Sequence, residues 1–157
     1  MGGSAPQGVS FRRAEERDLP AVIALLAEGS LVKGRDDASL PLDPGYLATF
    51  HAMDADQNTL LIVGEIANEV LACMQISFIP GLTYRGGWRA HIEGVRVADR
   101  MRGKGIGHAL MEEAMRLSRE RGCKIMQLFT HNDRRDAHRF YESLGFERNH
   151  LGFRRAL

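Results

Sequence analysis

The residues from Arg102 to Gly107 read Arg-Gly-Lys-Gly-Ile-Gly, and no other segment of this 157-residue chain is better suited to bind an anion. A strand-like run from Ala90 to Val97 precedes the segment, and a helix-like run from Gly105 to about Arg121 follows it. A helix start carries roughly half a unit of positive charge, and glycines let the backbone approach a ligand closely. Arg102 and Lys104 add side-chain charge, so we expect a phosphate-bearing ligand at this turn.

Two common phosphate-binding motifs do not fit this segment. Gly103, Gly105 and Gly107 have the spacing GxGxG, whereas dinucleotide-binding folds use GxGxxG. The segment is not a Walker loop either, because no Gly-Lys-Ser/Thr follows four residues after a glycine. The turn is therefore expected to belong to a different fold.

Hydrophobic periodicity predicts the elements that position the turn. We expect strands at 9–14, 59–66, 70–79, 90–97, 124–130, 146–148 and 151–157. We expect helices at 19–28, 46–53, 105–121 and 137–144, a hairpin turn at 67–69 and a flexible connection at 81–87. This order does not alternate as in a doubly wound fold. The predicted fold class is therefore α+β, with a mixed, mostly antiparallel sheet of six to seven strands and about four helices.

Charge is distributed unevenly along the chain although the net charge is only +1. Residues 1–80 carry five basic and eleven acidic side chains, and residues 81–157 carry sixteen and nine. The basic half contains the glycine turn, which suits a polyanionic ligand, although a merely solvated surface is the alternative. No exposed aromatic residues are interleaved with the basic ones, so we expect no nucleic-acid partner.

Cysteine content and hydropathy bear on metal binding, membrane insertion and cellular location. Cys73 and Cys123 are not in CxxC or CxxH spacing, so we expect buried thiols and no metal site. No apolar run reaches the roughly 18 residues that span a bilayer, and we identify no signal peptide. We therefore expect a cytoplasmic protein without a membrane partner. A single domain is expected over residues 8–157, after a flexible tail at residues 1–7.

Two segments of the chain resemble the GNAT superfamily of N-acetyltransferases. Residues 102–107 match the pattern Arg/Gln-x-x-Gly-x-Gly/Ala. Residues 136–146, Asp-Ala-His-Arg-Phe-Tyr-Glu-Ser-Leu-Gly-Phe, match Ala-x-x-(aromatic/Leu)-Tyr-x-x-x-Gly-Phe. The likeness spans residues 9–157. One departure is Arg134, which stands where many members carry an Asn that helps to hold the pantetheine arm of the cofactor.

The resemblance implies acetyl-CoA as cosubstrate and no metal. The turn would hold the pyrophosphate through its backbone N–H groups, and the preceding strand would pair with the pantetheine amides as an added strand would. His138 would line the pantetheine arm, with plain surface exposure as an equal alternative. The implied cofactor-binding residues are Val95, Val97, Arg102, Gly103, Lys104, Gly105, Gly107, His138 and Tyr141.

The same resemblance implies catalytic roles for Glu93, Val95 and Tyr141. A protonated amine is not a nucleophile, so Glu93 is the candidate general base, acting through water. The backbone N–H of Val95 would face the thioester oxygen, and the Tyr141 hydroxyl would donate to the departing sulfur. Ordinary packing or sheet pairing is the alternative for each residue. His91 shares the face of Glu93 and either assists it or is simply packed.

The acceptor is less clearly indicated. We expect its pocket to form from residues 29–58, 80–89 and the C-terminal segment near His150. Five acidic residues favour a cationic small-molecule or peptide amine, such as a polyamine, an aminoglycoside or a protein lysine; they are Asp36, Asp37, Asp43, Asp54 and Asp56. A solvated acidic loop is the alternative. The sequence leaves open whether the protein forms a homodimer. The second functional hypothesis is a non-catalytic acyl-CoA-binding module on the same fold.

Overall fold

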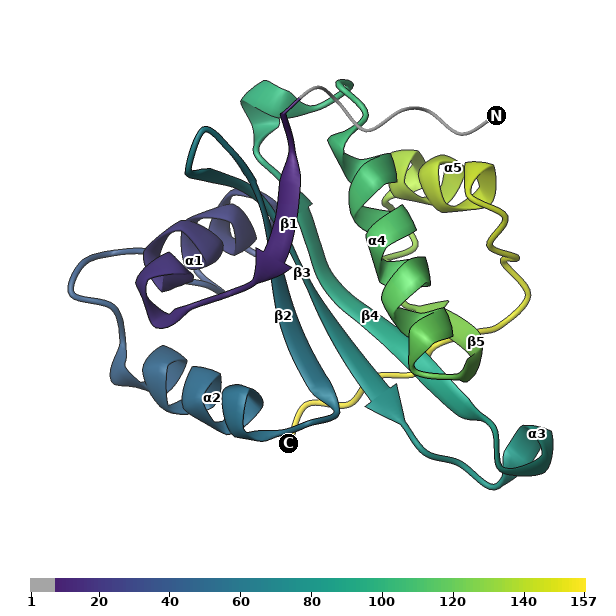
Figure 1. Ribbon diagram of the computed structural model, residues 1–157. Coiled ribbons are helices and arrows are strands. Elements are labelled where there is room, and N and C mark those ends of the chain that lie inside the picture. Colours follow the sequence, from purple (N-terminus) through teal and green to yellow (C-terminus); the bar gives the residue numbers. More distant parts are fainter. Residues whose placement is uncertain (1–7) are drawn as a thin grey trace. The chain divides into compact units, whose positions relative to one another are not determined.

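The computed structural model describes residues 8–157, so the tail expected at residues 1–7 lies outside the described residues. The strands are β1 (Ser10–Arg13), β2 (Thr59–Ile66), β3 (Glu69–Ile79), β4 (Trp88–Val97) and β5 (Cys123–Leu128). The α-helices are α1 (Leu19–Glu28), α2 (Pro44–Ala55), α3 (Thr83–Gly86), α4 (Ile106–Glu120) and α5 (Arg135–Ser143). Two 3-10 turns are η1 (Glu16–Asp18) and η2 (Asp99–Met101). The strands form one sheet in the order β1-β2-β3-β4-β5, and the pairs from β1 to β4 are antiparallel (Figure 1).

The chain divides into two compact units. The first ends at Gln127 and contains the glycine turn, α1 to α4 and nearly all of the sheet. The second runs from Leu128 to Leu157 and contains α5. The single domain expected over residues 8–157 stays a prediction.

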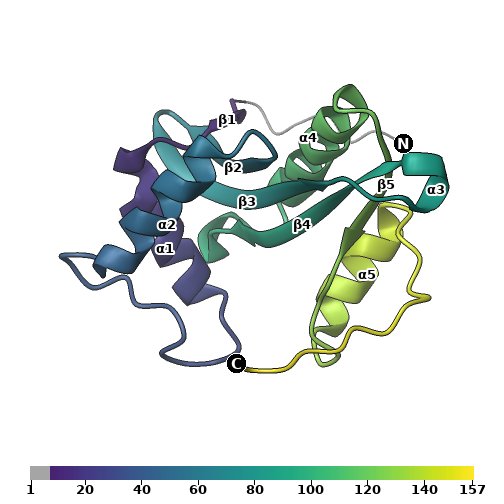
Figure 2. The same cartoon turned by 90° about the horizontal axis from the view of Figure 1, so that it is seen from below.

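Different helices cover the two faces of the sheet in the first unit. Leu71 and Cys73 of β3 lie in one buried cluster with Val22 and Leu25 of α1. Met74 points to the opposite face because side chains alternate along a strand, and it is fully buried there. Helix α4 packs against β3 and β4, whereas α2 packs against β2. Figures 1 and 2 show α1 and α2 on one face and α4 on the other. Strand β4, which leads into the glycine turn, is therefore held from both sides.

Two local predictions in the first unit are confirmed. Ala67 and Asn68 have φ of +50° and +65° and form a two-residue turn between β2 and β3. Helix α4 begins at Ile106 and ends at Glu120, before Gly122 with its φ of +78°. Asn68 and Gly122 are residue types that tolerate a left-handed backbone, whereas alanine at position 67 adopts it less readily.

The predicted number of strands is wrong. Residues 146–148 and 151–157 have no regular secondary structure, and the side chains of Leu151 and Phe153 are 84% and 95% exposed. Apolar residues without a partner strand or a buried face do not stabilise a strand. The described residues thus form five strands rather than six to seven, and five α-helices rather than about four. The additional helix, α3, is a single turn within the connection expected at 81–87.

Candidate active site

The turn between η2 and α4 presents a run of backbone N–H groups. Gly103 and Gly105 have φ of +74° and +81°, a conformation that residues with a side chain rarely adopt. In the part of the chain that the structure describes, the backbone nitrogens of Gly103, Lys104 and Gly105 donate to no protein acceptor. Ile106 and Gly107 begin α4, where the first N–H groups have no intrahelical acceptor. The turn therefore has the donors that an anion site at a helix start requires.

The two charged side chains of the turn differ in their surroundings. The Arg102 guanidinium lies 2.6 Å from Oδ1 of Asp99, and both side chains are more than half exposed. Such a pair contributes about 0–1 kcal/mol in water, so Arg102 can exchange Asp99 for a ligand at little cost. Nζ of Lys104 lies 3.6 Å from Sδ of Met101, which is only a weak acceptor. Among the described residues Lys104 has no carboxylate partner, so its charge is available to a ligand.

Strand β4 carries a β-bulge at Gly94 and Val95. These two residues lie opposite the single residue Met74 of β3, because the register shifts between Cys73 and Gln75 of that strand. Gly94 has a φ of +59°, as is typical of a bulge whose first residue is glycine. A bulge therefore lies at Val95, the residue whose backbone N–H the family resemblance assigns to the thioester oxygen. It interrupts the regular ladder between β4 and β3 at this point.

Glu93 and His91 lie side by side on the face of β4 opposite to that of Ala90 and Ile92, which are buried. The Glu93 side chain is 55% exposed, and its Oε1 lies 3.9 Å from Nε2 of His91. Nε2 of Gln127 on β5 lies 3.4 Å from Nδ1 of His91. With the amide donating there, neutral His91 carries its proton on Nε2, toward Glu93. Glu93 is thus accessible to water or an amine and has a polar neighbour.

Gln127 was not singled out by the sequence analysis. The residue lies in the run predicted as a strand at 124–130, but its position beside His91 depends on the pairing of β4 with β5. The one feature of the sequence that could have indicated a role for Gln127 is its polar side chain within a mostly apolar strand.

His138 and Tyr141 belong to the second unit, in α5. The Tyr141 ring packs edge-on against Phe140 and Phe146, with centroids 5.1 and 5.8 Å apart. Nε2 of His138 lies 3.0 Å from the carbonyl oxygen of His131, and Nδ1 lies 3.2 Å from a guanidinium nitrogen of Arg148. Neutral His138 therefore donates through Nε2 and accepts at Nδ1. Their roles beside the cofactor stay predictions.

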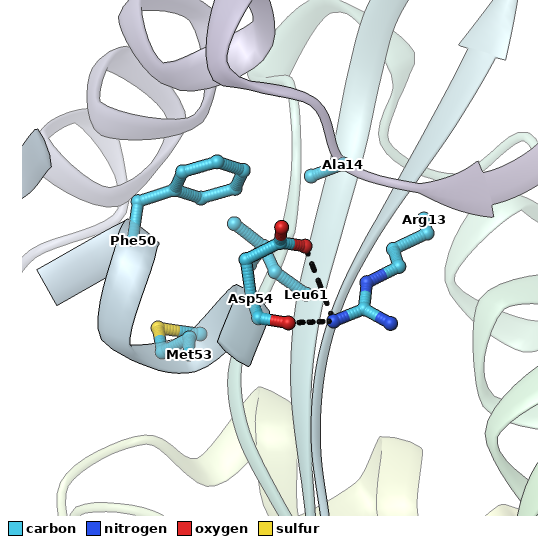
Figure 3. Close-up of a pocket in the computed structure, with 6 residues that line it drawn as sticks. All are labelled: Arg13, Ala14, Phe50, Met53, Asp54 and Leu61. Atoms are coloured by element: carbon cyan, nitrogen blue, oxygen red, sulfur yellow. Dashed lines mark hydrogen bonds and ion pairs between the residues drawn. The ribbon is translucent and has the colours of Figure 1, made fainter. Parts of the chain in front are cut away.

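The acidic residues at 29–58 make local contacts rather than a free acidic cluster. Asp36 pairs with Arg35, Asp37 accepts from Ser39 N–H, Asp43 from Gly45 N–H, Asp54 pairs with Arg13, and Asp56 accepts from Asn58 N–H. Figure 3 shows Arg13 of β1 reaching Asp54 at the end of α2, where it contacts the carbonyl oxygen at 3.0 Å and Oδ1 at 3.2 Å. A small pocket lies beside this pair, lined also by Ala14, Phe50, Met53 and Leu61. Local contacts of this kind do not test the expected cationic acceptor, which stays a prediction.

Two further observations limit the chemistry of the described residues. Within residues 8–157 no three His, Cys, Asp or Glu side chains are grouped so as to hold a metal ion. No helix in that range is long and apolar enough to span a bilayer.

Comparison with known protein families identifies the family of this chain. Residues 29–146, most of the chain, match the model of the acetyltransferase (GNAT) family. The chain belongs to the GNAT family. The resemblance stated from the glycine turn and the α5 segment is thereby confirmed, and this GNAT protein is an acetyl-CoA-dependent acetyltransferase.

Three similar proteins illustrate the match, two described as acetyltransferases and one as a transcriptional regulator. The aminoalkylphosphonate N-acetyltransferase of Salmonella typhimurium is 31% identical over 147 residues, which cover 94% of this GNAT chain and 90% of that protein. A solved structure described as a transcriptional regulator from Bacillus halodurans is 41% identical, with a TM-score of 0.92 and coverage of 95% and 99%. An acetyltransferase from Trypanosoma brucei is 26% identical, with a TM-score of 0.77 and the same coverage.

Proposed function

We propose that this GNAT protein transfers the acetyl group of acetyl-CoA to a primary amine by direct attack in a ternary complex. The observation that carries the proposal is the placement of Glu93 just before the bulge, on the strand that leads into the glycine turn. A cosubstrate bound to that turn and along β4 would bring its thioester to the bulge, next to a carboxylate.

The turn residues fit the phosphates of acetyl-CoA. Gly103, Lys104 and Gly105 offer N–H groups with no protein acceptor among the described residues, and Arg102 and Lys104 offer positive charge. The backbone of Val95 and Val97 would pair with the pantetheine amides as a neighbouring strand would. Acetyl-CoA supplies the activated acetyl group, and the chain supplies binding, orientation and proton transfer.

Three groups of the chain would carry the reaction. Glu93 accepts the proton of the amine, directly or through water, with the Nε2–H of His91 close by. The N–H of Val95 stabilises the negative charge that develops on the thioester oxygen. Tyr141 donates its hydroxyl proton toward the departing sulfur, which with a thiol pKa near 8.5 needs little help.

The acceptor that we favour is a small amine that also carries an anionic group. Arg89, His91, Glu93 and Arg96 lie on one face of β4, because each pairs with an odd-numbered residue of β3. The Glu93 carboxylate and the Arg89 guanidinium on one face suit a zwitterion, whereas the Arg96 side chain contacts the Val95 carbonyl instead. The name of the Salmonella relative makes aminoalkylphosphonates the first acceptors to test.

The experiment is thiol release from acetyl-CoA with a panel of aminoalkylphosphonates, amino acids, polyamines and aminoglycosides. We expect turnover with the aminoalkylphosphonates, and a fall in kcat of about a hundredfold or more in Glu93→Gln with unchanged affinity for CoA. Glu120→Gln, an exposed glutamate at the end of α4, is the control and should behave as wild type.

Two outcomes contradict parts of this proposal. Tight CoA binding without turnover on any amine would favour the non-catalytic acyl-CoA-binding module. Turnover on polyamines alone would contradict the anionic acceptor and leave acetyl transfer intact.

A further inference from the structure

Arg96 follows the bulge and folds its side chain back onto it. One of its terminal nitrogens donates to the carbonyl oxygen of Val95 at 2.8 Å. Its Nε is shielded from solvent, and Arg96 pairs with Cys73 of β3. Because Cys73 lies in the cluster with α1, the Arg96 side chain is on the face that α1 covers. The guanidinium therefore contacts the bulge on the α1 side of the sheet, next to the end of α1.

Cys73 holds the other carbonyl of the bulge. Its Sγ donates to the carbonyl oxygen of Gly94 at 3.6 Å, and the side chain is 1% exposed. Burial raises the pKa of the Cys73 thiol to about 12, so it stays protonated and remains a donor at neutral pH. The Gly94 carbonyl and the Val95 N–H belong to one planar peptide group. A contact that orients this carbonyl therefore also orients the N–H.

Gly29, just after α1, makes room for Arg96. A Cβ atom at Gly29 would lie 2.4 Å from Nε and 2.5 Å from Cδ of Arg96. The φ of Gly29 is −86°, which any residue adopts. Glycine therefore matters here for the space it leaves, which Cδ and Nε of Arg96 fill, so a side chain at this position would displace the outer part of Arg96.

We propose that Arg96 is a positioning residue for acetyl transfer. Together with Cys73 it holds the two carbonyls that flank Val95, so that the Val95 N–H keeps its direction toward the thioester oxygen. Gly29 is required because it admits Arg96. The inference rests on the proposed function, since it concerns the geometry of the donor that the reaction uses.

The test compares Gly29→Ala, Arg96→Met and the double variant. A shift of about 1 Å at a reacting centre can cost on the order of a hundredfold in rate, so we expect each single variant to lose about tenfold or more in kcat. The KM for acetyl-CoA should change less than kcat, because the glycine turn that would hold the phosphates is untouched. The double variant should be no slower than Arg96→Met, since removing the guanidinium relieves the clash.

Two further variants serve as controls. Arg96→Lys keeps a donor of similar reach and should recover part of the lost kcat. Arg116→Met makes the same change as Arg96→Met at a half-exposed arginine of α4, away from the bulge, and it should match wild type.

The outcomes separate this inference from the proposed function. A wild-type enzyme without amine acetylation contradicts the proposed function. An active wild type whose Arg96→Met variant keeps the same kcat contradicts only the role of Arg96. If the loss of kcat in the double variant equals the combined losses of Gly29→Ala and Arg96→Met, Gly29 and Arg96 act independently and the proposed link between them is contradicted. If Gly29→Ala does not fold but the double variant does, the clash between a side chain at position 29 and Arg96 is supported. Arg96→Met still tests the positioning role in that case.

Discussion

The glycine turn at 102–107 and the bulge at Gly94 and Val95 both prepare backbone N–H groups for a ligand, but they are built in different ways. The turn depends on neighbours in sequence, namely left-handed glycines and the start of α4. The bulge depends on side chains from β3 and on space at the end of α1. An arrangement formed by neighbours in sequence can be predicted as a motif, whereas one formed by distant segments cannot.

The largest expected effect breaks the turn and leaves the bulge intact. In Gly105→Glu a carboxylate would occupy the phosphate position, and the residue would have to adopt a φ of +81°. We expect CoA affinity to fall by about a thousandfold or more, measured by titration calorimetry, because like charges replace a charge-assisted contact.

A matched substitution at the other end of α4 controls for strain. Gly122 has a φ of +78° and open space around it, so Gly122→Glu carries the same backbone penalty without touching the turn. Unchanged CoA binding by Gly105→Glu, or an equal loss in both variants, would refute the placement of the phosphates.

An effect of intermediate size links the bulge to global stability. The pKa of Cys73 is about 12 in the folded protein, whereas an unfolded thiol ionises near pH 8.5. Above that pH the unfolded state gives up its proton first, so the free energy of unfolding falls as pH rises toward 12. Between pH 8 and pH 10 we expect a loss of about 2 kcal/mol from this group, measured by urea denaturation.

Cys73→Ser isolates this contribution, because a serine hydroxyl does not titrate in the range. The alkaline decline should be shallower in Cys73→Ser by about that amount, while a turn variant such as Arg102→Gln keeps the wild-type decline. Equal slopes for wild type and Cys73→Ser would show that the thiol contributes nothing to this linkage.

The smallest expected effect concerns the side-chain charge of the turn. Arg102 is exposed and paired with Asp99, so its exchange for glutamine removes an interaction of about 1 kcal/mol or less. We expect CoA affinity to fall by about threefold, and by less at high salt. A loss as large as that of Gly105→Glu would mean that the guanidinium, rather than the backbone, holds the phosphates.

The agreement between sequence and structure follows the same division. The glycine turn, the two-residue turn at Ala67 and Asn68 and the bounds of α4 were predictable, because each depends on residues within one turn of the backbone. The strands expected at 146–148 and 151–157 were wrong, because a strand needs a partner that its own residues do not specify. Four of the five acidic residues singled out at 29–58 contact a residue within two positions along the chain, whereas Asp54 pairs with Arg13 of β1, and the sequence predicted none of these contacts.

From the chain of residues alone came the family, the enzyme class and the glycine turn, since short-range backbone preferences and two motifs are enough for these. Tertiary structure decided that Glu93 adjoins His91 and Gln127, and that Cys73, Arg96 and Gly29 converge on the bulge. The physical reason is that strand register and the packing of α1 on the sheet bring these side chains together. The sequence predicted the hairpin that joins β2 to β3, but no motif indicated the pairing of β4 with β5 or the packing of α1 beside the bulge.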